Sequence, residues 1–264
     1  HTLSLHDALP ISGIDHMSAM QNINEIKARG GKIKAFRSYA GGLVAPESDD
    51  NPWHYKISWN PGNVVRAGQG TAQYLDEGRY KYIPYNRLFS QFKMVYVMGM
   101  GHYEVYANRD SLLYRHQYGL EDIPTIIRGT IRHPGFCDAW NALVQLGITD
   151  DSYPIIESED MTYFDLVQAY LPSRSRGNSL RERVADFLEQ DPHSEVMHKL
   201  EWLGLFSKRK IRLERATPAY ILENLLLEKW ALRPQDKDMI IMQHEFDFEL
   251  HGEERRLVST MVLE

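Results

Sequence analysis

The chain lacks several features that would assign it to a class at once. Its 264 residues contain one cysteine, Cys137, so no disulfide can form within them, and a reducing compartment, by default the cytoplasm, is expected. No stretch approaches the roughly 18 apolar residues that a membrane helix needs, and the mean hydropathy is −0.45. The net charge of −6 argues against a nucleic-acid-binding face. We therefore expect neither membrane nor nucleic acid as a partner.

A nucleotide cradle and a metal cluster are missing from the pattern as well. The run "GMGHYE" at Gly99 lacks the third glycine of a dinucleotide-binding fingerprint, and no Walker pattern occurs. His244 and His251 are seven positions apart on an alternating pattern, which argues against a shared metal ion. Cys137 stands at an expected helix start, where a thiol pKa can fall, but a small buried side chain is the favoured interpretation. We expect no cofactor-binding and no metal-binding residues here.

Helical and alternating patterns are mixed along the rest of the chain, which predicts an α/β or α+β fold. The expected helices of the first half span residues 15–28, with Asp15 as N-cap, then 64–76 and the stretch that ends at Gly147. The expected strands span residues 32–39, 55–59, 125–132 and two short runs within 92–107.

Four segments follow from these patterns. Residues 1–12 ("HTLSLHDALPIS") do not continue into the next helix and resemble translated sequencing-adapter sequence, so we exclude them and expect the chain to be a fragment. Residues 13–149 form the α/β part, and residues 150–234 a small helical domain marked by a capping box at Ser179 and an N-cap at Thr217. Residues 235–264 alternate strictly and predict a hairpin that returns to the first sheet.

Arginines carry the strongest chemical signal. In "TIIRGTIRH", Arg128, Thr130 and Arg132 share one strand face, and guanidinium forks suit a ligand that bears carboxylates. The run "NRDS" places Arg109 just past a strand, a usual position for a site residue. The alternative is that Arg109 pairs with Asp110 or a helix end, and Arg128 with an acid.

The stretch "RSYAGGLVAPESDDNPWHYKISW" is too rich in glycine and proline for a helix, and we expect a loop. Gly41 and Gly42 permit either a close backbone approach or a positive φ. Tyr55, Ile57 and Trp59 share a face of the short strand. Core packing is the alternative to a site there, and it fits Tyr55 better than Trp59.

In order along the chain, the motifs "GIDHMSAM", "SYAGGLVAPESDDNPWHYKISW", "YANRDS", "IIRGTIRHPGF" and "DMIIMQHEFDFEL" resemble the glutamate-forming saccharopine dehydrogenase family. The resemblance runs from about Gly13 to the end. It implies reversible conversion of saccharopine, with NAD(P) and water, to glutamate and aminoadipate semialdehyde. It also implies an upstream Rossmann domain that binds NADP or NAD, a mixed-sheet substrate and dimerisation domain, an inserted small helical domain, and a homodimer.

The resemblance also implies roles for single residues. Arg109 in "NRDS" matches the arginine that grips a substrate carboxylate, and Arg132 faces the same pocket. The other implied substrate-binding residues are Trp59, Asn108, Ser111 and Tyr39. Asp15 and His16 belong to the loop between the cofactor and substrate domains and are the candidates for catalysis.

Two departures from the family pattern qualify this assignment. The family's "Leu-Asp-Pro-Gly" is replaced by "PISG" at positions 10–13, which removes an acid–base aspartate, and the cysteine of its "Ser-Tyr-Cys-Gly-Gly" is Ala40 here. The alternatives are a related Schiff-base-reducing dehydrogenase of the carboxynorspermidine or homospermidine type, or a non-catalytic binding or dimerisation module. We expect the chain alone to have no dehydrogenase activity.

Overall fold

The computed structural model describes residues 9–57, 62, 65 and 70–264. The chain divides into two compact units. The sheet unit comprises residues 1–48, 70–134 and 236–264, and the helical unit comprises residues 49–69 and 135–235. The sequence predicts a helical domain that starts at residue 150. In the structure the helical unit already starts at Gly135, and it also includes residues 49–69 from the first half of the chain.

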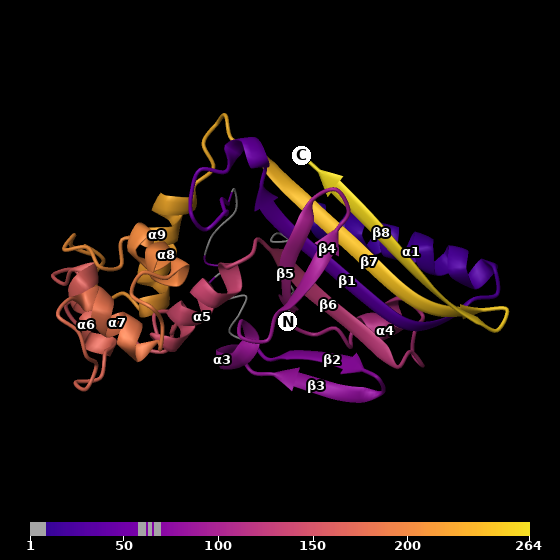
Figure 1. Cartoon of the computed structure of the whole chain (residues 1–264), viewed down its shortest axis with the longest axis horizontal. Helices are drawn as coiled ribbons and strands as arrows, with labels where there is room; N and C mark the ends of the chain where they lie inside the picture. Colours follow the sequence, from indigo (N-terminus) through magenta and orange to yellow (C-terminus); the bar gives the residue numbers. More distant parts are fainter. Residues whose placement is uncertain (1–8, 58–61, 63–64, 66–69) are drawn as a thin grey trace. The chain divides into compact units, whose positions relative to one another are not determined.

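The sheet unit is built from strands with one long helix and short helical turns (Figure 1). Its helical elements are α1 (Leu9–Ala28), η1 (Pro46–Ser48), α3 (Tyr85–Leu88) and α4 (Tyr114–Gln117). Its strands are β1 (Lys32–Val44), β2 (Ala72–Asp76), β3 (Arg79–Ile83), β4 (Lys93–Val97), β5 (Gly101–Ala107), β6 (Thr125–Arg132), β7 (Asp238–Leu250) and β8 (Glu253–Leu263).

Among the described residues the strands form one mixed eight-stranded sheet in the order β3-β2-β6-β1-β7-β8, with β5 also on β6 and β4 on β5. Strands β1 and β6 are parallel, whereas β7 runs antiparallel to β1 and β8 antiparallel to β7. The predicted return of the terminal hairpin to the first sheet is therefore confirmed. The mixed α/β class is confirmed too.

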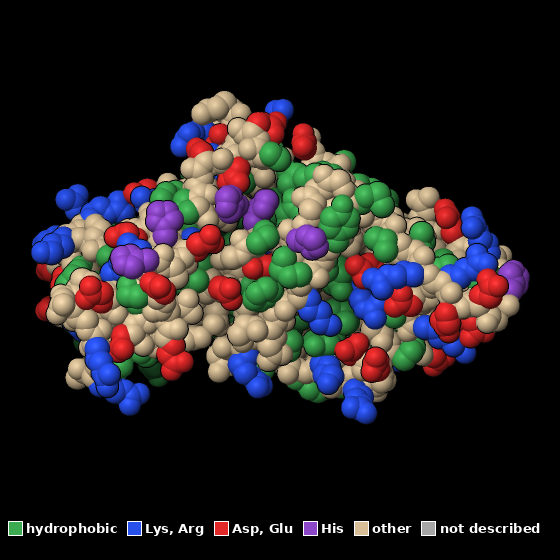
Figure 2. Space-filling model, in the orientation of Figure 1, with side chains coloured by type: hydrophobic (Ala, Val, Ile, Leu, Met, Phe, Trp, Pro, Cys, Tyr) green, Lys and Arg blue, Asp and Glu red, His purple; other side chains and the backbone are tan. Residues whose placement is uncertain are grey.

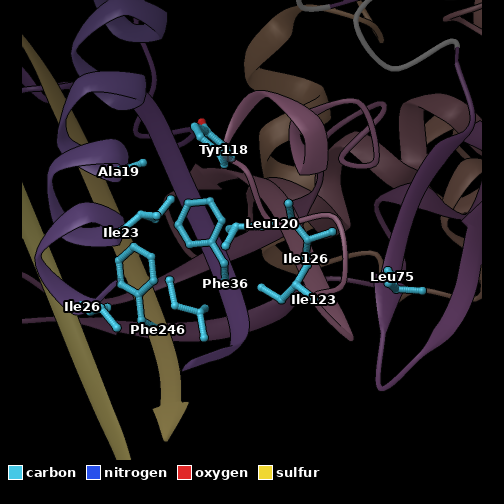
Figure 3. Close-up of a cluster of buried hydrophobic side chains, with 11 residues drawn as sticks. Ala19, Ile23, Ile26, Phe36, Leu75, Tyr118, Leu120, Ile123, Ile126 and Phe246 are labelled. Atoms are coloured by element: carbon cyan, nitrogen blue, oxygen red, sulfur yellow. The ribbon is translucent and has the colours of Figure 1, made fainter. Parts of the chain in front are cut away.

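Helix α1 packs on one face of this sheet, which we call the helix face. Its Ala19, Ile23 and Ile26 meet Phe36 of β1 and Phe246 of β7 in a closed apolar cluster (Figure 3). The phenyl rings of Phe36 and Phe246 stack with centroids 4.8 Å apart. Full burial of such a side chain stabilises the fold by about 1.5–3 kcal/mol, so this cluster fixes α1 on the sheet.

The opposite face has its own apolar cluster. Tyr39 of β1, Val105 of β5, Ile131 of β6 and Ile241 of β7 are among its buried members. Strands β1, β6 and β7 are thus covered on both sides near their middles. A strand covered on both sides buries consecutive residues, and β7 does so from Ile241 to Phe246.

The helical unit contains five helices among the described residues. They are α5 (Phe136–Gln145), α6 (Tyr163–Tyr170), α7 (Leu180–Phe187), α8 (Glu195–Leu203) and α9 (Pro218–Trp230). The predicted capping box at Ser179 and the N-cap at Thr217 are both present. None of the described helices is long and apolar enough to cross a membrane.

An aromatic core explains why this unit reaches back to residues 49–57. The indole of Trp53 packs edge-on against Trp230 with centroids 5.3 Å apart, and its Nε1–H donates to the Lys199 carbonyl at 3.0 Å. Phe136 and Trp140 of α5 stack in the same core. Because Trp53 and α5 are buried together with α8 and α9, they belong to the helical unit. Cys137 is also buried, which agrees with the interpretation of this cysteine as a small buried side chain.

Three element predictions are wrong in part. Residues 72–76 of the expected helix 64–76 form strand β2, because Glu77 and Gly78 adopt positive φ and close a hairpin with β3. Strand β1 continues through the expected loop to Val44. Helix α1 already includes Leu9, so Asp15 lies inside it and is not its N-cap.

The short strand expected at 55–59 is reduced, within the described residues, to a single bridge between Ile57 and Ala231. Tyr55 and Ile57 are both buried, which supports core packing for them. Between them, Lys56 is buried as well and pairs with Asp50 at 2.9 Å.

Candidate functional site

Strand β6 presents its polar residues on the helix face of the sheet. In register, Arg128 lies beside Ser38 of β1, Thr130 beside Ala40 and Tyr106, and Arg132 beside Glu104. Because laterally paired residues share a face, the two arginines and the threonine lie on one face, as their alternation predicts. That face also holds Phe36 and Phe246 under α1, so the polar row continues from the apolar cluster along the same strands.

Arg128 is held at the inner end of this row. Its Nη2 donates to the Asp15 carboxylate at 2.5 Å, and its guanidinium lies 3.9 Å from the centre of the Tyr114 ring. Asp15 is fully buried, and its other oxygen accepts the hydroxyl of Ser38 at 3.1 Å. Pairing with an acid, the alternative left open for Arg128, is therefore what the structure shows.

The segment Asn108–Ser111 is fastened at both ends to the backbone of Arg128. Asn108 donates its N–H to the Arg128 carbonyl at 2.9 Å, and the Arg128 N–H is donated to the Ser111 hydroxyl at 2.9 Å. Gln73 of β2 holds the middle through its N–H to the Arg109 carbonyl at 2.7 Å. Ser111 is buried by these contacts, so it anchors the loop.

Arg109 differs from the other arginines of the site. It is exposed and has a φ of 38°, a left-handed backbone conformation that residues other than glycine rarely adopt. Its guanidinium has no hydrogen-bond or ion-pair partner among the described residues, and Asp110 instead accepts the N–H of Leu112 at 2.8 Å. Strained backbone often occurs at ligand-binding positions, and here it coincides with a loop that hydrogen bonds fix to β6.

Arg132 is buried at the outer end of the row. Its Nη1 donates to the Ile131 carbonyl at 2.9 Å, and its guanidinium lies 6.0 Å from the centre of the Tyr106 ring. Glu104, opposite it in register, is buried as well. A guanidinium in such surroundings has a fixed orientation, which suits it to define one side of a site.

His16 is half-buried beside α4 rather than at the arginine row. Its Nδ1 lies 2.6 Å from the Tyr118 hydroxyl, and its ring stacks on Tyr114 with centroids 5.3 Å apart. Burial, and then the nearby Arg128, lower the pKa of His16, while burial raises the pKa of Tyr118. At pH 7 this hydrogen bond therefore joins a neutral imidazole to a protonated phenol.

Tyr39 does not join the other predicted residues. It pairs in register with Gly129, between Arg128 and Thr130, so its ring lies on the opposite face of the sheet. There it belongs to the apolar cluster, and burial raises its pKa. The structure therefore does not bring Tyr39 together with Arg128 and Arg132, and its substrate-binding role stays a prediction. Trp59 lies outside the described residues.

The helical unit has an open cavity of about 370 Å³ whose lining includes the basic residues Arg209, Lys210 and Arg212. It contains none of the predicted site residues. Arg209 is already neutralised there by Glu228, whose carboxylate accepts two hydrogen bonds from Nη1.

The profile of the saccharopine dehydrogenase C-terminal domain family matches residues 12–264. The chain belongs to this family. It is 32% identical over 255 residues to the saccharopine dehydrogenase (NADP(+), L-glutamate-forming) of Saccharomyces cerevisiae, covering 95% of this chain and 57% of the yeast protein. It is 36% identical over 243 residues to the mitochondrial alpha-aminoadipic semialdehyde synthase of Rattus norvegicus, covering 89% of this chain and 26% of that protein.

The fold of this family member also matches a solved structure. The apo histidine-tagged saccharopine dehydrogenase (L-Glu forming) from Saccharomyces cerevisiae superposes with a TM-score of 0.83 at 32% identity, over 95% of this chain and 57% of that one. The chain thus spans about half the length of the yeast relative.

Sequence reasoning missed the groups that hold Asp15 and Arg128 in place. They are Ser18, Ser38, Tyr114 and His244. For His244 there was a signal, because the strict alternation of β7 marks it as an inward histidine. The hydroxyls of Ser18 and Ser38 carry no such mark, since their partners come from other elements.

Proposed function

We propose that this chain supplies the substrate-binding half of an NAD(P)-dependent saccharopine dehydrogenase. Its reaction is saccharopine plus NAD(P)⁺ plus water giving L-glutamate, 2-aminoadipate 6-semialdehyde, NAD(P)H and a proton. Support comes from the family to which the chain belongs and from relatives named for the NADP(+)-linked, L-glutamate-forming reaction. The parent protein is then an oxidoreductase of lysine metabolism.

The observation that carries the proposal is the placement of Arg109. Its backbone is strained, and its exposed guanidinium has no ion-pair partner among the described residues. The loop that carries it is hydrogen-bonded to β6, the strand that also carries Arg132. Saccharopine has three carboxylates, and a guanidinium fork binds a carboxylate through two parallel hydrogen bonds. Asn108, also exposed and adjacent in the loop, is placed to hydrogen-bond the same ligand.

The residues of this half bind and orient the substrate, whereas the hydride chemistry belongs to the cofactor. We propose that NADP or NAD is bound mainly by a Rossmann domain elsewhere in the parent protein. Asp15 is fully buried and both its carboxylate oxygens are engaged, which supports a structural role for it. His16, neutral and half-buried, stays the candidate for proton transfer.

The decisive experiment measures saccharopine-dependent reduction of NADP and of NAD by the full-length parent protein at the nicotinamide absorbance band. Arg109→Ala should raise KM for saccharopine, since loss of a charged hydrogen bond costs about 1.5–3 kcal/mol, or roughly 10- to 150-fold in affinity. Arg79→Ala is the matched control, because Arg79 is an exposed arginine on β3. Equal kinetics for the two variants, or turnover of a polyamine-type Schiff base in place of saccharopine, would refute the assignment.

We also propose a cytoplasmic homodimer. Met94 and Tyr96 are exposed on strand β4, which among the described residues pairs only with β5, and Met98 is exposed in the turn that follows it. Figure 2 shows apolar side chains gathered over the β4–β5 hairpin. An apolar ladder on an edge strand is a surface that a second copy can cover. Tyr96→Lys should shift the mass measured by light scattering from dimer toward monomer. An unchanged dimer would show that the interface lies elsewhere on the protein.

A further inference from the structure

A row of hydrogen bonds runs across the helix face of the sheet and ends at Arg128. Ser18 Oγ of α1 lies 2.7 Å from His244 Nε2, and His244 Nδ1 lies 3.1 Å from Ser38 Oγ. Ser38 Oγ donates to Asp15 Oδ1 at 3.1 Å, and Asp15 Oδ2 accepts from Arg128 at 2.5 Å. His244 and Ser38 are each 2% exposed. The row therefore joins α1, β7, β1 and β6, and its middle, from His244 through Ser38 to Asp15, is buried, whereas Ser18 and Arg128 at its ends are partly buried.

The single proton of the Ser38 hydroxyl sets the direction of this row. If it is donated to Asp15, Ser38 can only accept from His244, so His244 carries its proton on Nδ1 and Nε2 accepts from Ser18. The reverse order would let Ser18 donate to the Asp15 backbone carbonyl, 3.2 Å away, but would deprive the buried carboxylate of the Ser38 proton. A hydrogen bond to a charged group contributes about 1.5–3 kcal/mol against about 0.5–1.5 for a neutral one. The first order is therefore favoured.

The groups around His244 keep its ring neutral. Asp15 Oδ1 is 3.7 Å from Nε2, too far for a direct hydrogen bond. Burial is the main cause that lowers the pKa of His244; Arg128 of β6 and His16 of α1, the other titratable groups that face the ring, lower it further, while Asp15 raises it. The rings of Phe36 and Phe246 complete the surroundings at 5.9 and 6.4 Å. A neutral imidazole has one donor and one acceptor, which is what the row requires.

The far end of the row reaches the candidate site through the Arg128 backbone. The Arg128 carbonyl accepts the N–H of Asn108, and the Arg128 N–H is donated to the Ser111 hydroxyl. The guanidinium of Arg128 is in turn held by Asp15, whose second oxygen is oriented by Ser38. A continuous series of hydrogen bonds thus connects His244 and Ser38, through Asp15 and Arg128, to the loop that carries Arg109.

We propose that His244 and Ser38 are positioning residues for the carboxylate-binding loop. A directional row Ser18–His244–Ser38–Asp15, with His244 as the neutral Nδ1–H tautomer, holds Arg128 and through it Asn108–Ser111. The positioning role rests on the proposed function, because it matters to catalysis only if Arg109 binds substrate. The tautomer and the structural coupling do not depend on turnover.

The first test is nitrogen-15 NMR of the histidine rings in the 264-residue chain. The expected result is an Nδ1–H signal for His244 at pH 7.5, and the Nε2–H tautomer would overturn the proposal. Ser18→Ala should keep the Nδ1–H tautomer, because Ser38 still accepts. Ser38→Ala should abolish the Nδ1–H preference and shift the backbone amide signals of residues 108–111, and an unmoved loop would also overturn it.

Two controls separate positioning from mere loss of packing. Ser90→Ala removes an exposed hydroxyl that donates to the Arg87 carbonyl, so it should leave the His244 tautomer and the loop signals unchanged. In the full-length parent protein, Ser38→Ala removes a hydrogen bond to the charged Asp15 and should raise KM for saccharopine about tenfold, the lower end of the worth of such a bond, with a smaller change in kcat. If the parent protein does not turn over saccharopine but His244 has the expected tautomer, the proposed function is wrong and the proposed hydrogen-bond row is still supported.

Discussion

The hydroxyl of Ser111 accepts the backbone N–H of Arg128 at 2.9 Å, across 17 residues of sequence. This bond makes a short polar loop a fixed part of strand β6. The loop holds Arg109 at a positive φ, a conformation that costs of order 1–3 kcal/mol and persists only where neighbouring contacts enforce it. The Ser111 bond is therefore a means of maintaining the exposed guanidinium.

Ser111→Ala tests that role directly. The substitution leaves the Arg128 N–H without its acceptor, and an unsatisfied buried donor costs about 1–3 kcal/mol. We expect the free energy of unfolding, measured by urea denaturation with fluorescence detection, to fall by that amount. Ser90→Ala, at an exposed hydroxyl, should change it by less than about 0.5 kcal/mol. Equal effects of the two substitutions would show that Ser111 does not anchor the loop.

The half-buried His16 and the buried His244 predict how stability depends on pH. Burial lowers the pKa of both His16 and His244, whereas unfolded histidines titrate near about pH 6.5. As pH falls below this value, the unfolded state binds more protons than the folded one, so the free energy of unfolding decreases. We expect thermal stability to be fully present above about pH 7 and to be lost as pH falls toward 5.5.

Calorimetry of His16→Asn and His193→Asn between about pH 7.5 and 5.5 assigns this dependence. His193 is exposed, so its substitution should leave the slope of stability against pH unchanged. His16→Asn should flatten the slope, because one depressed imidazole is removed. A slope that is the same in all three proteins would assign the acid sensitivity to other groups.

Local patterns predicted the elements whose signals lie within one segment. Strand β6 has the predicted bounds because its β-branched residues alternate with polar ones, and α7 begins at the predicted capping box. The failure at 72–76 has a tertiary cause. Helical spacing there is overridden by the hairpin at Glu77–Gly78 and by the packing of Leu75 in the apolar cluster.

The sequence could not predict which side chains form hydrogen bonds and ion pairs with one another. Asp15 and Arg128 are 113 residues apart, and Ser18 and His244 are 226 apart, so no local pattern connects them. Tyr39 shows the related limit for sheet faces. The register of β1 against β6 decides its face, and a shift of one residue would place its ring beside the arginines.

Gly41 tests the close approach of two strands. A Cβ at this position would lie 2.4 Å from the Ile131 carbonyl oxygen, and neither backbone can move without breaking the pairing of β1. Gly41→Ala should lower the free energy of unfolding by about 1–3 kcal/mol, as overpacking does. Gly70→Ala is the control, because a Cβ there meets nothing within 4 Å. Similar denaturation midpoints for the two variants would mean that β1 and β6 separate readily at this point.

The buried pair of Asp15 and Arg128 should behave unlike an exposed pair of the same chemistry. Arg128→Met leaves the fully buried Asp15 carboxylate without a counter-charge, which costs about 3–5 kcal/mol. Asp15→Asn combined with Arg128→Met should recover much of that loss, because no unpaired charge remains. The exposed pair Arg209–Glu228 is the reference, and Glu228→Gln should cost at most about 1 kcal/mol. Additive effects of Asp15→Asn and Arg128→Met in urea denaturation would contradict a direct coupling, and with it the route by which α1 holds the Arg109 loop.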